Sequence, residues 1–139
     1  MNLAEQAVVV LNNFLLAMNK WENYWYNLKI ANPTVDYRIE QKKEIDIIYE
    51  KYVTTKERKQ GRQVSLSARY PSTFTPNYGF ISYELSSNNK KIAIEIHHKF
   101  DTGIEGKYRY NLIFKDNEWR IDRREIFDYY DNKWIKDNL

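Results

Sequence analysis

The chain has 139 residues, with 22 Lys or Arg, 19 Asp or Glu and no cysteine. Its length suits one domain with its own core, so we expect residues 1–139 to form a single domain. The missing cysteine excludes disulfides, thiolate nucleophiles and cysteine metal sites. The small net charge of +3 is spread through the chain, which argues against nucleic acid as a partner.

Residues 3–30 predict a long amphipathic helix. Its apolar residues recur at spacings of three and four, which line one helix face: Leu3, Ala7, Val10, Phe14, Met18, Trp21, Trp25 and Leu28. The stretch is long for a globular helix, so we expect a break or kink near Asn19-Lys20. Asn32-Pro33 ends the helix, because the residue before proline avoids the α conformation.

The same stretch is neither a signal peptide nor a membrane span. No basic segment precedes it, and Asn12-Asn13 interrupts its most apolar part. We therefore expect a cytoplasmic protein without a membrane partner.

A second helix is predicted after Thr34, which would be its N-cap, with Asp36 in the first turn. Its inner face would carry Tyr37, Gln41, Ile45, Ile48 and Tyr52. The basic run at residues 56–59 precedes Gly61, as cations do at a helix C-terminus that ends in glycine. Phosphate binding by this run is the alternative.

From Arg62 the apolar period changes to two, which indicates strands. A first strand would contain Val64, Leu66, Ala68 and Tyr70. A loop over residues 71–79 follows, and we expect its Phe74 and Tyr78 to fold back onto the body of the protein. The next two strands are marked by Ile81, Tyr83 and Leu85 and by Ile92, Ile94 and Ile96, with a turn at residues 86–89 between them.

The clearest pattern is a hairpin after residue 107. Tyr108, Tyr110, Leu112 and Phe114 alternate with Lys107, Arg109, Asn111 and Lys115. Asp116-Asn117 tolerates positive φ and suits a tight turn, after which Trp119 and Ile121 resume the alternation. Helices followed by sequential strands predict an α+β fold, with N-terminal helices packed on a curved antiparallel sheet.

Two polar residues fall on the apolar face of this sheet. The inward register reads Ile92, Ile94, Ile96, His98 and Phe100 on one strand, and Trp119, Ile121 and Arg123 on the last. His98 and Arg123, with Tyr83, Tyr108 or Tyr110 beside them, would line a pocket that binds an anion or uses His98 as a general base. Alternatively, a bulge or twist near the strand ends turns both residues to solvent.

The sequence contains no recognised catalytic or cofactor motif, so no cofactor is expected. Adjacent His97 and His98 would point to opposite faces of a strand, which makes a metal site between them unfavourable.

The order of elements resembles the nuclear transport factor 2-like superfamily, whose cystatin-like cone is shared with ketosteroid isomerases. The chain is similar in particular to the immunity proteins of this fold that accompany bacterial polymorphic toxins. Two segments carry the resemblance, Phe14-Leu-Leu-Ala-Met-Asn-Lys-Trp21-Glu22 and Tyr110-Asn-Leu-Ile-Phe-Lys-Asp-Asn-Glu-Trp119-Arg-Ile-Asp122.

The resemblance implies a non-enzymatic inhibitor that binds and neutralises a cognate toxin protein. The slight positive charge makes a strongly basic nuclease a less suitable toxin. The outward-facing residues are the candidates for partner binding: Glu95, His97, Arg109, Asn111, Lys115 and Arg120. Two alternatives remain open, a small-ligand-binding or isomerase-like protein that uses His98 and Arg123, and a homodimer formed through the outer face of the sheet.

Overall fold

Two long helices, one short helix and a five-stranded antiparallel sheet form the computed structural model, which describes residues 1–70, 72–99, 103 and 105–139. The side chain of Ile81 is also outside the described part, as are Pro71 and Phe100 of the predicted loop and inward register. The elements in chain order are α1 (Leu3–Ala31), α2 (Arg38–Tyr52), α3 (Arg62–Ser65), β1 (Gly79–Leu85), β2 (Lys91–Lys99), β3 (Glu105–Lys115), β4 (Glu118–Asp128) and β5 (Lys133–Asp137).

The first helix confirms the predicted span and its end before Pro33, but the predicted break near Asn19-Lys20 is wrong. The apolar stripe is buried on both sides of Asn19, so packing keeps the helix continuous through this point. The side-chain amide of Asn19 donates to the backbone carbonyl of Phe74 at 2.8 Å, so it does not compete for the backbone of its own helix.

The second helix begins later than predicted. Asp36 accepts from the backbone N–H of Arg38 at 3.0 Å, and Tyr37 rather than Thr34 is the N-cap. Indole N–H groups attach the helix to α1, because Trp21 donates to the backbone carbonyl of Gln41 and Trp25 to the carboxylate of Glu44.

The region after α2 differs most from the prediction. The helix ends at Tyr52, so the basic run at residues 56–59 does not form a helix C-terminus. The predicted strand over residues 62–70 is wrong, since residues 62–65 form α3 and irregular chain follows. Arg62 is buried in an ion pair with Glu22, and Gln41 donates to the backbone carbonyl of Leu66 at 2.9 Å, so tertiary contacts override the local alternation.

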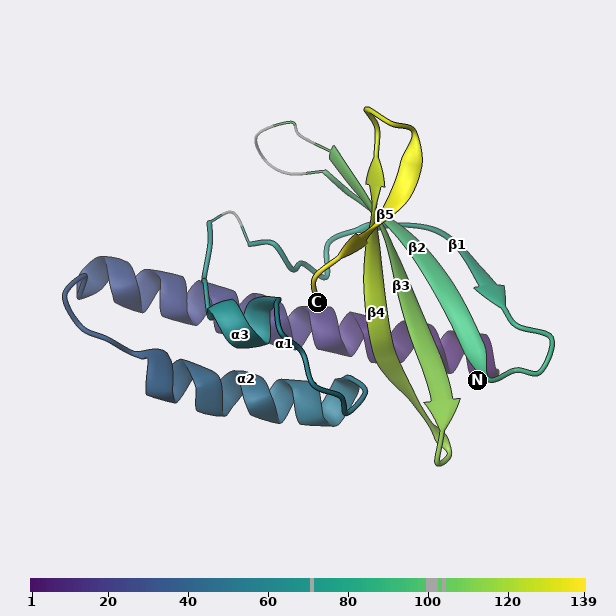
Figure 1. The fold of residues 1–139 in the computed structure, drawn as a ribbon, viewed down its shortest axis with the longest axis horizontal. Coiled ribbons are helices and arrows are strands. Elements are labelled where there is room, and N and C mark those ends of the chain that lie inside the picture. Colours follow the sequence, from purple (N-terminus) through teal and green to yellow (C-terminus); the bar gives the residue numbers. More distant parts are fainter. Residues whose placement is uncertain (71, 100–102, 104) are drawn as a thin grey trace.

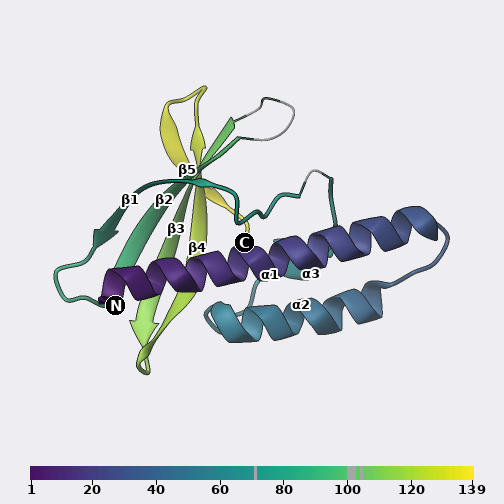
Figure 2. The same cartoon turned by 180° about the vertical axis from the view of Figure 1, so that it is seen from behind.

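The sheet is a meander in the order β1-β2-β3-β4-β5, as predicted for its first four strands. Figure 1 looks onto one face of the sheet, and Figure 2, from behind, shows α1 running across the other face with α2 and α3 beside it. We call the face against α1 the inner face and the opposite one the outer face. No helix in the described ranges lies over the outer face.

The core lies between α1 and the inner face, as the alternating pattern predicts. Ile92, Ile94 and Ile96 of β2 and Tyr110 and Leu112 of β3 are buried there. Asp116 and Asn117 have φ values of 53° and 64°, which confirms the predicted tight turn. The edge strand β5 was not predicted.

Candidate functional site

A β-bulge in β4 changes which of its residues lie on the inner face and which on the outer face, compared with the prediction. Asn111 pairs with Arg123, but the next residue of β3, Leu112, pairs with Ile121, so Asp122 is an extra residue. A bulge reverses the alternation beyond it. Arg124 is therefore buried on the inner face and Arg123 is exposed on the outer face. The prediction that Arg123 lines an inner pocket is wrong, because the bulge turns this residue to solvent. The alternative, in which both residues turn to solvent, holds for Arg123 but not for His98, which stays buried.

Arg124 occupies the inner position instead. Its Nε lies 2.8 Å from Oδ2 of Asp137, and its Nη atoms donate to the backbone carbonyl of Asn138 at 3.0 Å and to the Tyr110 hydroxyl at 3.3 Å. Its guanidinium carbon is 5.1 Å from the centre of the Phe74 ring. Burial by itself would lower the pKa of Arg124, but Tyr110 and Asp137 outweigh burial and raise that pKa, so the buried group stays charged.

A second buried charge pair lies nearby. Glu22 of α1 is fully buried, 2.6 Å from Nη1 of Arg62, and accepts from the backbone N–H of Phe74 at 2.9 Å. Phe74 is 1% exposed, with Arg62 and Arg124 against its ring. The loop that carries Phe74 thus folds back as predicted and fills the space between sheet and helices where the pocket was expected.

The structure separates the predicted pocket residues. His98 is buried on the inner face, opposite Gly106 in register. Tyr108 and Tyr110 are also buried there, with their rings near Arg124. Tyr83 shares the inner register through its pairing with Ile94, but it is 47% exposed on the edge strand. Two tyrosines therefore meet an arginine as expected, but the arginine is a different one.

The sequence prediction missed Arg124, Asp137 and Glu22. Glu22 follows Met18 by four residues and precedes Trp25 by three, so it lies on the buried stripe of α1, and its helical spacing was the available signal. For Arg124 the available signal was the break in the alternation between Ile121 and Ile126, which does not locate the extra residue. Asp137 gave no comparable signal, because the edge strand arises from pairing between strands.

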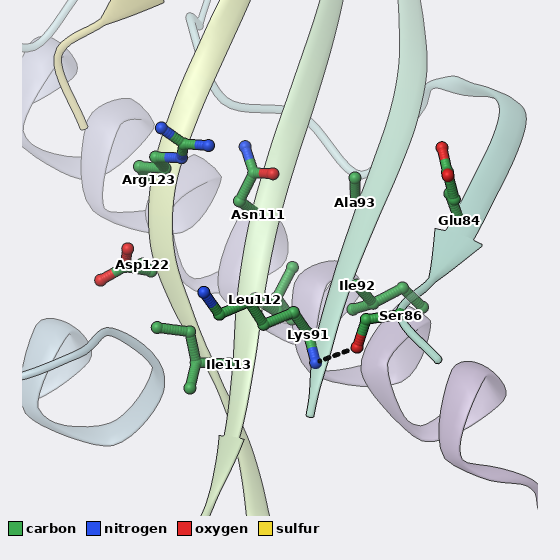
Figure 3. A pocket seen from close by; sticks show the side chains of 10 residues that line it. All are labelled: Glu84, Ser86, Lys91, Ile92, Ala93, Asn111, Leu112, Ile113, Asp122 and Arg123. Carbon is green, nitrogen blue, oxygen red and sulfur yellow. Dashed lines mark hydrogen bonds between the residues drawn. The ribbon is translucent and has the colours of Figure 1, made fainter. Parts of the chain in front are cut away.

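The outer face contains a hollow of about 470 Å³. Paired positions on four strands place Glu84, Ala93, Asn111 and Arg123 in one row across the sheet. Figure 3 shows this row, with Ala93 and Asn111 between the two charged residues. Because Ala93 is short, the face is low at this point, and Lys91 and Asp122 also line the hollow.

A second hollow, of about 410 Å³, shares Asp122 and Arg123 with the first. Its other walls come from residues 56–60 and from 136–139. Asp122 accepts from the Lys56 ammonium at 3.0 Å and from the Thr54 hydroxyl at 2.9 Å. Burial by itself would raise the pKa of Asp122, but these bonds outweigh it and lower the pKa. Arg123 therefore lies between the two hollows, next to the Asp122 carboxylate, which is already paired with Lys56.

Three of the predicted partner-binding residues form a connected group on the outer face, namely Glu95, Arg109 and Asn111. Arg109 makes two bonds of 3.1 Å to Glu125, and Asn111 donates to the same carboxylate at 2.9 Å. Glu95 is 3.9 Å from Arg109. The Arg109 guanidinium holds the pKa of Glu125 below its usual range. This network fixes several long side chains before any partner binds.

The remaining three predicted partner residues are placed differently. His97 lies 3.4 Å from Glu105. Lys115 is exposed at the end of β3. Arg120 bends toward the end of α2, where it donates to the backbone carbonyl of Val53 at 3.2 Å and is 2.9 Å from Glu118. Arg120 is thus used to join sheet and helix.

Among the residues that the structure describes, no group of three or more His, Asp or Glu side chains could hold a metal ion. Among the described helices, none is both long and apolar enough to cross a membrane.

Comparison with known proteins gives two matches. Residues 6–138 match the family model described as NTF2 fold immunity protein. The chain is 44% identical over 134 residues to "Immunity protein RhsIA" of Dickeya dadantii (strain 3937), with 96% of each chain covered. No solved structure gives a significant match.

Proposed function

We propose that this chain, which belongs to the NTF2 fold immunity protein family, acts by binding a cognate toxin protein through the outer face of its sheet, without catalysis. Its function is immunity, as the match over residues 6–138 and the 44% identical relative indicate. Beyond immunity itself, we propose that the outer face is the binding surface and that the partner is a toxin protein. We also propose that the protein acts without catalysis and in the cytoplasm.

One observation carries the choice of surface. Beside the hollow around Arg123, the outer face has a network in which Glu125 holds both Arg109 and Asn111. Side chains that are already ordered lose less conformational entropy when a partner binds. An inhibitory complex needs roughly 800 Å² of surface from each partner, an area that a five-stranded sheet face can supply.

The packing of the inner face argues against a small-ligand pocket there, and so favours a role in protein binding. Phe74 fills the space where the pocket was expected, and the buried charges there are paired with each other. The alternative of an isomerase-like protein needed His98 and Arg123 on one face, and Arg123 lies on the other. That alternative therefore loses the geometry that supported it.

Co-expression tests the proposal. The chain and the product of the adjacent toxin gene should purify as one complex, and the chain should restore growth of cells that produce the toxin. Free active toxin in the presence of excess chain, with no complex on size-exclusion chromatography, would sink the proposal. Restored growth without a complex would instead point to a catalytic or indirect mechanism.

Filling the outer hollow with a larger side chain tests whether the outer face binds the toxin. Ala93→Phe places a ring at the floor of the outer hollow, and we expect toxin binding to weaken at least about tenfold. Ala17→Phe is the matched control, because Ala17 lines a hollow of about 400 Å³ on the helical side and is also half-buried. Equal loss of binding in both variants, or loss only in the control, would move the contact away from the outer face.

A further inference from the structure

We propose that the tip of the β4–β5 hairpin, residues 128–132 with Tyr130 at its end, is the anchor that enters an apolar pocket of the toxin. This inference rests on the proposed function, and it names the part of the surface that dominates the binding energy.

The tip exposes the aromatic side chains of two consecutive residues. Tyr130 is 96% exposed and Tyr129 is 59% exposed, and the hairpin projects beyond the rest of the sheet in Figure 1. A fully exposed tyrosine contributes nothing to the core, while tyrosine, tryptophan and arginine are the residues most often found at the energetic centre of protein interfaces.

The tip is held in one conformation. Oδ1 of Asp128 accepts from the backbone N–H groups of Tyr130 at 2.9 Å and of Asp131 at 3.3 Å, which closes the turn. Asn132 supplies the positive φ, 55°, that returns the chain to β5. The backbone under Tyr130 is therefore ordered before binding, which lowers the entropy cost of using it as an anchor.

An aromatic cluster on the outer face supports the tip from below. Phe127 and Trp134 are partners in register with ring centres 5.3 Å apart, and Tyr129 packs edge-on against Phe127 at 5.0 Å. Lys107 lies 4.6 Å above the Phe127 ring, and Arg109 lies 4.4 Å above the Trp134 ring. Contacts of both kinds are favourable even at exposed sites.

This cluster is continuous with the network described above. Arg109 touches Trp134 on one side and Glu125 on the other, and Glu125 also holds Asn111 at the rim of the hollow. A partner that covers the hollow and the tip would therefore meet one rigid surface, with an aromatic projection at its end.

The chemistry of the tip defines the pocket that it fits. The phenol of Tyr130 calls for apolar walls with a hydrogen-bonding group at the base. Asp131 is exposed and has no cation within ion-pair distance in the described ranges, whereas Lys107 and Arg109 already lie on aromatic rings. We infer a lysine or arginine on the rim of the toxin's pocket, opposite Asp131.

Isothermal titration of the purified full chain with the purified toxin tests the anchor. Tyr130→Ala should raise Kd at least about thirtyfold, as expected for a central interface residue, with no change in Tm because the side chain packs on nothing. Tyr24→Ala is the control, since Tyr24 is 57% exposed on α1, and its Kd should equal that of the wild type. Asp131→Lys should raise Kd about tenfold, and more at low salt than at high salt.

The outcomes separate the two proposals. Toxin that fails to bind the wild-type chain overturns the proposed function, and this inference with it. Toxin that binds wild type and Tyr130→Ala equally overturns the anchor alone. A loss in Tyr130→Ala that is matched in Tyr24→Ala also overturns it, because the effect would then not belong to the tip.

Discussion

Arg124 of β4 and Asp137 of β5 form an ion pair, with 2.8 Å between Nε and Oδ2, that joins the edge strand to the inner face of the sheet. The arginine is 5% exposed, so its charge depends on this neighbour and on Tyr110. The pair also connects the bulge in β4 with the strand that sequence patterns did not reveal.

Asp137→Ala should destabilise the fold by about 3 kcal/mol, because it leaves a buried guanidinium without its carboxylate. Urea denaturation monitored by tryptophan fluorescence would measure the free energy of unfolding. Asp131→Ala on the same hairpin is exposed and should change that free energy by less than about 0.5 kcal/mol. Equal values for the two variants would contradict a structural role for the ion pair.

Glu22→Ala should cost about 3–5 kcal/mol, since it removes the partner of buried Arg62 and the acceptor for the backbone N–H of Phe74. The loop at residues 66–78 should then become sensitive to limited proteolysis under native conditions. Glu40→Ala on the exposed side of α2 is the control and should leave both readouts unchanged. A Glu22 variant with wild-type stability and an intact loop would refute this account.

Tyr49 gives a prediction at alkaline pH. Burial raises the pKa of its hydroxyl to about 12, and within the described ranges this hydroxyl has no hydrogen-bond partner. A raised pKa favours the neutral phenol in the fold, so its contribution is complete below pH 10 and is lost as the pH rises toward 12. Tyr49→Phe cannot ionise, and between pH 10 and 12 it should lose about 2 kcal/mol less stability than the wild type.

Denaturation of both proteins at several alkaline pH values measures that difference and cancels the ionisation of the other tyrosines. At neutral pH the variant should be equal to the wild type or up to about 1 kcal/mol more stable, because it removes an unpaired buried hydroxyl. Parallel losses of stability for the two proteins up to pH 12 would show that the Tyr49 hydroxyl is not buried.

Gly61→Ala should destabilise more than Gly103→Ala. Both glycines have positive φ, 105° and 86°, so an alanine at either position is strained. Only at Gly61 would the new Cβ overlap the backbone oxygen of Leu139, while Gly103 has open space around it. We expect a loss of about 1 kcal/mol at Gly103 and at least about twice that at Gly61, measured as the free energy of unfolding. Similar losses at both positions would mean that the clash is relieved cheaply.

Local patterns in the sequence determined much of the architecture. The apolar spacing of α1, the alternation along β2 and β3, and the positive-φ turn at Asp116-Asn117 all depend on near neighbours in the chain, and each was predicted correctly. Folding back of Phe74 was also predictable, because an apolar ring in a polar loop gains free energy when it is buried.

Tertiary structure decided the rest, because the residues concerned depend on partners far away in the sequence. Residues 62–70 alternate like a strand, but Arg62 joins Glu22 on α1 and the segment turns into α3 instead. The bulge at Asp122 shifts the register by one residue, which moves Arg123 outward and Arg124 inward. The alternation within β4 breaks between Ile121 and Ile126, but this break does not show where the extra residue lies. Only the pairing with β3 places it at Asp122, and that position decides which arginine is available to a partner.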